Sequence, residues 1–273
     1  MTAHSIEDVQ QVMLNALQEF HEFCLRNQLR YYLIGGSLIG AVRHQGPIPW
    51  DDDIDIGMPR PDYLRFQELS SEFSPSYRVS YVGGDAGYIY PFSKVYDVRT
   101  SVTEVLCFEF TRGVWLDVFP LDGTFQGRAM RTFHLWLARL MKGGFATVTG
   151  AYVPKDCSRA VRSVRACIRW VAKPVPVGWI HSALHSFLAL KSFDASTHVA
   201  NLLGRWGARE VSRREVFEAA VPMQFANHEF LAPVGYDEYL RGVYGDYMRL
   251  PPEAARVPAH STGHISLVKS FID

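Results

Sequence analysis

Residues 36–56 read GSLIGAVRHQGPIPWDDDIDI and set the architecture of the chain. The run opens with a Gly-Ser turn, contains one arginine and closes with four aspartates interleaved with isoleucine. Residues two apart on an extended strand point to the same face of a sheet. We therefore expect Asp51, Asp53 and Asp55 to face together in front of the buried isoleucines, with Asp52 turned away.

Carboxylates at this spacing need a counter-charge. Two ionised carboxylates roughly 6.5 Å apart repel by about 2.5 kcal/mol at an effective dielectric constant of about 20. A divalent cation supplies the counter-charge, and oxygen ligands suit Mg²⁺ or Mn²⁺, with Mg²⁺ leaving positions for phosphate and water. A solvated acidic turn is the alternative. The alternation with isoleucine and the glycine that follows favour the metal site.

The acidic residues also match the ligand spacing of a helix-loop-helix calcium site. That motif needs glycine at its sixth position, where this chain has Ile56, and a bidentate glutamate at its twelfth, where it has Asp62. Pro59 and Pro61 would also stiffen the loop. The sequence therefore disfavours a calcium loop.

Bulk composition indicates a globular chain. Its 273 residues, 48% of them hydrophobic, suffice for one sizeable domain or for a core domain with an appended helical lobe. No apolar run approaches the roughly 20 residues that span a bilayer, and no signal peptide is visible. We expect a cytoplasmic protein with reduced thiols and no zinc site. Pairing of Cys157 with Cys167 stays open; the other cysteines are Cys24 and Cys107.

Charge is balanced overall but unevenly distributed. The chain has 28 basic and 28 acidic residues, yet residues 123–193 hold eleven Lys or Arg against one Asp, so that 11 − 1 gives +10. Within this segment Arg159, Arg162, Arg165 and Arg169 recur at helical spacing beside an apolar stripe. They form either a solvated face or a surface for an anionic membrane or a polyanionic acceptor. The zero net charge and the absence of an RNA-binding motif disfavour a nucleic-acid partner.

Hydrophobic periodicity and turn residues predict mixed helices and strands. An amphipathic helix with a capping box is expected to about residue 27, followed by a short strand at 31–34 and a glycine break. A short helix at 38–43 would offer its first amides to an anion. Further strands are expected at 53–57, 77–82, 88–95, 102–110 and 114–118, a helix from Pro61, a turn at 120–123, and helices around 133–141 and 161–171.

Residues 35–44 joined to 48–56 closely resemble the signature of the LicD family, phosphotransferases related to the fukutin group. The similarity continues in residues 91–95, 113–122, 236–240 and 244–247. Ser37 stands where many members have threonine, which keeps the hydroxyl. The resemblance implies an α/β (α+β) fold: a nucleotidyltransferase-like mixed sheet with flanking helices plus a helical lobe.

The resemblance also implies an activity. LicD proteins transfer a phospho-alcohol such as phosphocholine from a CDP-activated donor to a glycan hydroxyl, and release CMP. We accordingly expect an Mg²⁺-dependent (or Mn²⁺-dependent) enzyme that acts on a cell-surface glycan or teichoic-acid precursor, free or lipid-linked. Two alternatives stay open: nucleotidyl transfer with release of pyrophosphate, and a non-catalytic protein that binds sugar phosphates.

Roles for individual residues follow from the resemblance and fit the chemistry. The expected metal ligands are Asp51, Asp53, Asp55 and Asp117, of which the last three are also the expected catalytic residues. Asp117 is the candidate base, with a metal-bound group as the alternative.

Further residues are expected to bind substrate or to shape the site. Gly36 and Ser37 would cradle a phosphate, while Arg43 and Lys94 would neutralise charge on the transferred group. Trp50 is either a core residue or an aromatic wall for the donor. The late residues His260 and His264 are expected in a C-terminal lid or core.

Three segments are predicted along the chain. Residues 1–123 would form the nucleotidyltransferase-like catalytic core, and residues 124–214 a basic helical lobe on the acceptor or membrane side. Residues 215–273 would pack back on the core. Because of the arginines, we expect peripheral contact with the inner face of an anionic membrane.

Overall fold

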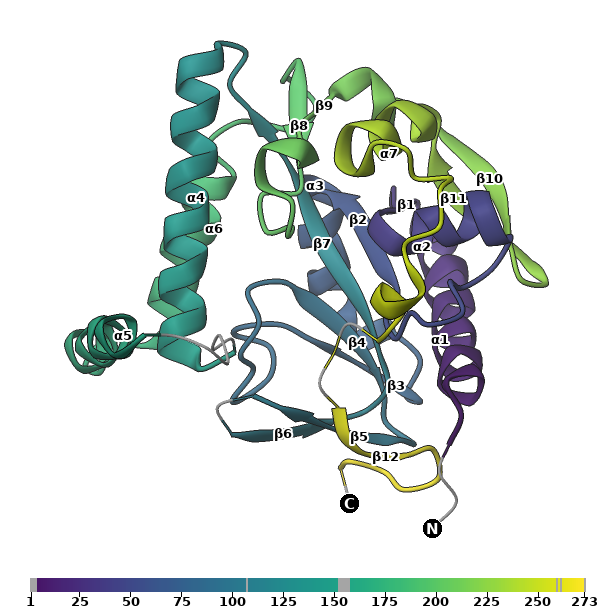
Figure 1. Ribbon diagram of the computed structural model, residues 1–273, viewed down its shortest axis with the longest axis horizontal. Coiled ribbons are helices and arrows are strands. Elements are labelled where there is room, and N and C mark those ends of the chain that lie inside the picture. Colours follow the sequence, from purple (N-terminus) through teal and green to yellow (C-terminus); the bar gives the residue numbers. More distant parts are fainter. Residues whose placement is uncertain (1–3, 107, 152–157, 259, 261, 273) are drawn as a thin grey trace.

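The computed structural model describes residues 4–106, 108–151, 158–258, 260 and 262–272. Helices and strands are mixed along the chain, which confirms the predicted α/β class (Figure 1). The elements up to residue 124 are α1 (Ile6–Arg26), β1 (Tyr32–Leu33), α2 (Gly35–Ile39), η1 (Gly40–His44), β2 (Asp55–Pro59), α3 (Arg60–Glu68), η2 (Ser70–Glu72), β3 (Tyr77–Ser80), β4 (Ser93–Asp97), β5 (Ser101–Val105), β6 (Glu109–Arg112) and β7 (Trp115–Thr124). They are followed by α4 (Arg128–Thr149), α5 (Arg159–Ala172), α6 (Val177–Leu188), β8 (His198–Ala200), η3 (Gly207–Glu210), β9 (Ser212–Arg213), η4 (Arg214–Phe217), β10 (Ala220–Phe225), β11 (His228–Pro233), α7 (Tyr236–Tyr244), η5 (Glu253–Ala255) and β12 (Thr262–Ser266).

The main sheet contains strands that carry predicted site residues. Its strands are ordered β1-β2-β7-β4-β3, with β2 and β7 parallel and the other neighbours antiparallel. Asp55 of β2 lies opposite Asp117 of β7, and Lys94 of β4 lies opposite the same Asp117 from the other side. The register of three adjacent strands therefore aligns two carboxylates and one ammonium group.

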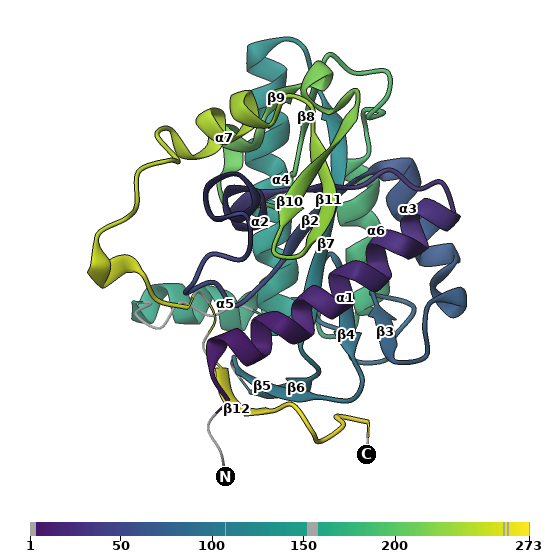
Figure 2. The same ribbon diagram turned by 90° about the vertical axis from the view of Figure 1, so that its right-hand side faces the viewer.

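Helices α1 and α3 pack together against this sheet. The predicted capping box is present, because the Asp8 N–H donates to Ser5 Oγ at 3.2 Å and the Ser5 N–H donates to Asp8 Oδ2 at 2.9 Å. Phe20 and Phe23 of α1 contact the edge of Phe66 in α3. In Figure 2 α1 runs across the strands β2, β7 and β4, and the largest buried cluster of side chains includes residues of α1 and of these strands.

Strand β7 continues to Thr124, through the segment predicted to turn, so that prediction is wrong. Pro120 lies opposite a residue of β2 on one edge of β7. On the other edge, pairing with β4 ends at Val118 and pairing with β8 begins at Asp122. Pro120 lies between the segments of β7 that pair with β4 and with β8, so its missing N–H removes no hydrogen bond to either strand.

Several other boundaries differ from the predictions. The strand expected at 88–95 begins only at Ser93, because the preceding residues pack in two directions: Tyr88 belongs to the main core, whereas Ile89 packs with Phe110 and Ala151 in a small separate cluster. The strand expected at 102–110 is the hairpin of β5 and β6, and β12 extends its sheet. Strand β2 begins at Asp55, so residues 51–54 lie outside regular structure and need not alternate. The glycines expected to break the first strand open helix α2.

The segment between residues 124 and 214 contains helices α4, α5 and α6 and also β8 and β9, which extend the main sheet. Most of the apolar stripe predicted near 133–141 faces away from the core: Phe133, Trp136 and Leu140 are 52%, 58% and 58% exposed, whereas Met141 packs against the core. Helix α4 instead buries His134, Ala138 and Phe145. Helix α5 projects from the body at the lower left of Figure 1 and buries none of its described side chains.

The three predicted segments stay predictions. Residues after 215 contact the elements around the main sheet, since the backbone of Gly35 bonds the Tyr239 hydroxyl of α7 and the Leu231 N–H of β11 donates to the Tyr31 hydroxyl at 3.3 Å. Strand β12 pairs with β5 in the smaller sheet. Cys24 is buried and Cys167 exposed, both as free thiols, while Cys107 and Cys157 lie outside the described residues. Within the described part of the chain, no helix is both long and apolar enough to cross a bilayer.

Candidate active site

Five aspartates gather where β2 begins. Asp53, Asp55 and Asp117 each have one carboxylate oxygen that lies within 4.8 Å of those of the other two. A second group with the same spacing comprises Asp51, Asp52 and Asp53, so Asp53 belongs to both. The structure thus brings three of the four predicted metal ligands together and places Asp51 in the neighbouring group. The expectation that Asp52 turns away is wrong, because residues 51–54 precede the strand.

The glycine pair before Ser37 makes room for two of these carboxylates. Gly35 has a left-handed backbone with φ of +57°, and a Cβ atom there would lie 2.5 Å from Asp55 Oδ2. A Cβ on Gly36 would lie 2.6 Å from Asp51 Oδ2. Either side chain would displace the carboxylate, since real Cβ contacts are not that short. Gly36, predicted to cradle a phosphate, therefore also sets the position of Asp51.

Ser37 joins helix α2 to strand β2. Its hydroxyl oxygen accepts the backbone N–H of Asp55 at 2.8 Å, and its side chain is buried. The hydroxyl hydrogen still has its own donor capacity. This contact fixes the first residue of β2 against the turn, and the predicted phosphate contact of Ser37 stays a prediction.

Lys94 is held inside the sheet. Its Nζ atom lies 2.8 Å from Asp117 Oδ1, and only 1% of its side chain is exposed. The ammonium also lies 4.5 Å from the ring centre of Tyr90 and 4.3 Å from that of Trp115. In this arrangement Lys94 neutralises Asp117, and a direct contact with a transferred phosphate stays a prediction.

Burial raises the pKa values of the clustered carboxyl groups. The pKa of Asp53 rises to about 6 and that of Asp51 to about 8, the latter also through repulsion by Asp53. Burial raises the pKa of Asp55 well above its usual range, and repulsion by Asp53 adds to the shift. At Asp117 burial also raises the pKa, although the Lys94 ammonium opposes it. The cluster therefore holds protons that a divalent cation would displace.

His260, predicted in a C-terminal lid or core, contacts the aspartate cluster from the C-terminal segment. Its backbone N–H and its Nδ1 atom each lie 3.1 Å from an oxygen of Asp52, and Nδ1 lies 3.8 Å from Asp53. Burial lowers the pKa of the imidazole, but the hydrogen bond to Asp52 and the charge of Asp53 outweigh burial and raise it to about 9. No spacing rule links this histidine to residues some 200 positions earlier, so the sequence offers no signal for the contact.

Arg43 and Trp50 lie beside the last segment of the chain. The Arg43 guanidinium donates to the carbonyl of Tyr247 at 2.6 Å, so it is engaged by the loop after α7. Trp50 is half-buried, with its ring 6.2 Å from that of His44 and beneath the guanidinium of Arg256. The predicted substrate contact of Arg43 stays a prediction.

Helix α7 adds a buried pair that the sequence does not single out. The Tyr239 hydroxyl donates to Glu210 Oε2 at 3.4 Å and receives a hydrogen bond from the backbone of Gly35. Burial raises the pKa of Glu210 to about 7. The pair supports the glycine turn from behind, and only the position of Tyr239 in the family motif of residues 236–240 could have indicated it.

The cluster fits a hard divalent cation. If all five aspartates are ionised and both Lys94 and His260 are charged, the net charge is −5 + 2 = −3. The group of Asp53, Asp55 and Asp117 offers oxygen donors alone, which suits Mg²⁺ or Mn²⁺. These three side chains would hold the ion.

Comparison with known proteins places this site within a family. Residues 28–135 match the family model described as LicD/FKTN/FKRP, nucleotidyltransferase domain. The chain is also 31% identical over 268 residues to the lipopolysaccharide cholinephosphotransferase LicD of Haemophilus influenzae, covering 94% of this chain and 96% of that protein. The chain belongs to the LicD family. The predicted resemblance is confirmed.

More distant members of the family share a shorter segment. The ribitol 5-phosphate transferase FKRP of Homo sapiens is 49% identical over 41 residues, which is 15% of this chain and 8% of that protein. The mouse protein matches equally well. The stretch matched by the LicD family model contains all eight predicted site residues, whereas Glu210, Tyr239 and His260 lie beyond it.

Proposed function

We propose that this member of the LicD family transfers a phospho-alcohol from a CDP-activated donor to a hydroxyl of a lipid-linked or cell-surface glycan, and releases CMP. The protein is a transferase, and phosphocholine is the first group to test, because the relative that matches along nearly the whole chain is a lipopolysaccharide cholinephosphotransferase. The observation that carries the proposal is the buried group of Asp53, Asp55 and Asp117 beside the glycine turn.

The residues of the site can each contribute to such a transfer. A divalent cation on Asp53, Asp55 and Asp117 would neutralise the donor pyrophosphate and polarise the bond that breaks. Asp117 would receive the proton of the acceptor hydroxyl, and Lys94 would stabilise Asp117 as a carboxylate until then. No covalent intermediate is proposed, so the acceptor oxygen attacks the transferred phosphorus in line with the departing CMP.

A donor panel tests this proposal directly. CDP-choline, CDP-glycerol and CDP-ribitol are each incubated with MgCl₂ and an acceptor glycan, and both CMP and pyrophosphate are measured. We expect CMP from at least one donor and a loss of at least about a hundredfold in Asp53→Asn, as for other preorganised charges. Asp246→Asn is the matched control, because that exposed aspartate lies outside the cluster. Release of pyrophosphate would instead assign nucleotidyl transfer.

Thermal stability measured with and without Mg²⁺ distinguishes the proposed enzyme from a non-catalytic sugar-phosphate sensor. A binding protein has no need of repelling carboxylates, so a degenerate site should show no rise in thermal stability with Mg²⁺. Turnover unchanged in Asp53→Asn would refute the proposed enzyme.

We also propose that the outer faces of α4 and α5 contact an anionic membrane. Phe133 and Trp136 of α4 are more than half exposed, and their rings lie 6.2 Å apart. On α5, Val164 and Val171 are 59% and 60% exposed. Arg162 is exposed on the same helix, and each arginine near an anionic surface contributes about 1 kcal/mol. Apolar area and positive charge together are what an interfacial helix requires.

Liposome co-sedimentation checks this contact. The protein should sediment with vesicles of anionic lipid and stay in solution with neutral vesicles. Phe133→Ser/Trp136→Ser should abolish sedimentation, while Leu25→Ser/Leu64→Ser removes equally exposed apolar side chains from α1 and α3 and should not. Equal binding to both vesicle types would refute an electrostatic component.

A further inference from the structure

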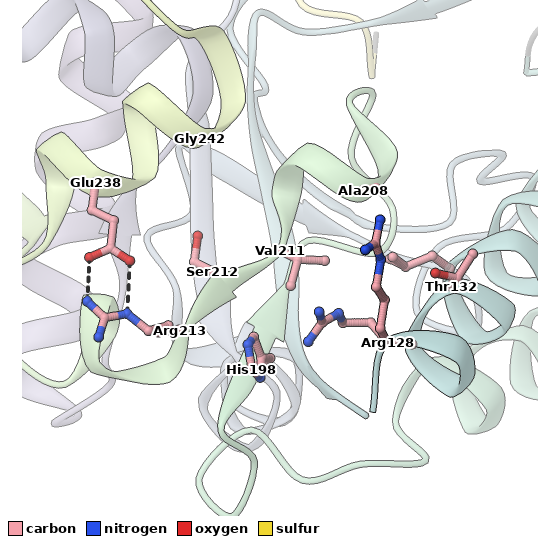
Figure 3. Close-up of a pocket in the computed structure, with 11 residues that line it drawn as sticks. Arg128, Thr132, His198, Ala208, Val211, Ser212, Arg213, Glu238 and Gly242 are labelled. Atoms are coloured by element: carbon pink, nitrogen blue, oxygen red, sulfur yellow. Dashed lines mark hydrogen bonds and ion pairs between the residues drawn. The ribbon is translucent and has the colours of Figure 1, made fainter. Parts of the chain in front are cut away.

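A surface groove lies away from the aspartates, between helix α4 and helix α7. Figure 3 shows this groove with Arg128, His198 and Arg213 around it. Its volume is about 460 Å³, within the range of small-molecule sites. We call it the arginine groove; it is lined by Arg128, Arg131, Thr132, Leu135, His198, Ala208, Val211, Ser212, Arg213, Glu238 and Gly242.

The arginine groove is electropositive. Glu238 is the one acidic residue among its lining residues, and both of its oxygens bond Arg213, at 3.1 and 2.8 Å. Arg131 donates to the backbone carbonyl of Gln126 at 3.3 Å. The Arg128 side chain has no hydrogen bond or ion pair with any residue that the structure describes. Two arginines therefore carry charge that no carboxylate in the groove neutralises.

The arginines also act on His198, which lines the same groove. Burial lowers the pKa of this imidazole, and the charges of Arg131 and Arg213 lower it further. Because positive charge on a histidine is disfavoured near other cations, the ring stays neutral and can accept or donate a hydrogen bond. The hydroxyls of Thr132 and Ser212 add two more polar groups to the lining.

The groove is separate from the carboxylate cluster but shares its supporting elements. His198 pairs with Thr124 at the far end of β7, seven residues beyond Asp117, which is roughly 23 Å along a strand. Helix α7 lines the groove with Glu238 and Gly242, while its neighbouring residue Tyr239 contacts the glycine turn of the active site. Helix α4 carries Arg128 and Arg131 together with the apolar face assigned above to the membrane.

We propose that the arginine groove binds a phosphate monoester carried by the acceptor glycan, at a distance from the hydroxyl that reacts. This inference rests on the proposed function, because it assumes a glycan acceptor. Guanidinium groups bind phosphate oxygens through paired hydrogen bonds, which favours a phosphorylated sugar over a neutral one. An extended acceptor could lie along α7 with its phosphate in the groove and its hydroxyl at the aspartates.

Binding is tested without turnover. Glucose 6-phosphate, glucose and inorganic phosphate are titrated into the full-length protein in EDTA, and the His198 ring signals are followed by NMR after assignment with His198→Gln. We expect saturable shifts with glucose 6-phosphate and none with glucose. In Arg128→Gln/Arg131→Gln the dissociation constant should rise at least about tenfold, because two charged donors are lost. Arg26→Gln/Arg65→Gln removes the same charge from exposed sites on α1 and α3 and should change nothing.

Three results would overturn the inference. His198 shifts that persist unchanged in Arg128→Gln/Arg131→Gln would exclude the arginines. The absence of any saturable shift would exclude the site. If inorganic phosphate binds as tightly as glucose 6-phosphate, the ligand of the arginine groove would be a free anion and not the acceptor glycan.

A kinetic measurement separates this inference from the proposed function. With the donor that releases CMP, Arg128→Gln/Arg131→Gln should raise KM for a phosphorylated acceptor at least about tenfold, leave kcat unchanged, and leave KM for the dephosphorylated acceptor unchanged. Equal KM values for both acceptors in the wild type would refute the groove as an acceptor site. Failure of every CDP donor would refute the proposed function and leave the NMR result standing.

Discussion

Raising the pH from about 6 to about 8 without divalent cations should weaken the fold, and Mg²⁺ should reduce this loss of stability. The pKa of Asp51 is about 8 in the folded chain against an ordinary value of 3.8, and that of His260 is about 9 against 6.5. Both folded-state values are raised, so the folded chain binds protons that the unfolded chain has released. Stability is therefore lost as the pH rises toward the folded-state pKa values.

The size of the effect follows from the number of protons retained. One retained proton costs about 1.4 kcal/mol of unfolding free energy per pH unit. Over this interval Asp51 contributes a loss of roughly 2 kcal/mol and His260 a further 1 to 2 kcal/mol. A total of about 3 to 4 kcal/mol is large against the 5 to 15 kcal/mol typical of native proteins. A divalent cation held by Asp53, Asp55 and Asp117 would place positive charge beside Asp51, favour its ionised form and so weaken the pH dependence.

Urea denaturation followed by tryptophan fluorescence measures this, in EDTA and in millimolar MgCl₂ at both pH values. Asp53→Asn/Asp55→Asn should lose the stabilisation by Mg²⁺, whereas Asp246→Asn should keep it. Stability in EDTA that is constant or rises across the interval would refute the assigned protonation. Equal stabilisation of the double variant and the wild type by Mg²⁺ would refute the metal site.

Three further substitutions test the surroundings of the cluster. Gly35→Ala should raise the Mg²⁺ concentration needed for activity at least about tenfold, because its Cβ would displace Asp55, one of the three side chains that would hold the ion. The control Gly143→Ala, in open space on α4, should stabilise the chain by up to about 1 kcal/mol and keep the wild-type Mg²⁺ requirement; equal requirements in the two variants would contradict the prediction. Lys94→Met should lower the free energy of unfolding, measured by urea denaturation, by about 3 to 5 kcal/mol, because Asp117 loses its buried partner. Mg²⁺ should restore part of this stability. A loss below about 1 kcal/mol would show that the ion pair is dispensable. Tyr239→Phe should lower the free energy of unfolding by about 1 to 3 kcal/mol and slow CMP release, since Gly35 and Glu210 both lose a hydrogen bond. An unchanged midpoint of urea denaturation would contradict this prediction.

The sequence predicts the local parts of this molecule well. The helix of residues 6–26 follows from its capping box and apolar spacing, and the aspartate run follows from side-chain chemistry. Asp117 could be joined to that run only through the family motif, because the parallel pairing of β2 with β7 leaves no mark in either strand. The register that places Lys94 on Asp117 is likewise a property of the assembled sheet.

The failures share one physical cause, which is context from distant residues. The stripe of Phe133, Trp136 and Leu140 has the period of a core helix face, yet the core contacts α4 on its other side. Pro120 is typical of a turn in the sequence, and only the assembled sheet shows that it lies where the neighbour of β7 changes from β4 to β8. Periodicity identifies a helix or strand, but it does not say which face another element covers.

The contact between His260 and Asp52 spans 208 positions of the chain. A ribosome releases the aspartates well before this histidine, so the sheet can assemble while its acidic end still lacks an imidazolium. Chains that lack His260 should therefore fold with a more strongly proton-binding or metal-dependent cluster than chains that contain it. Synthesis itself thus sets the order in which the charges of the site are balanced.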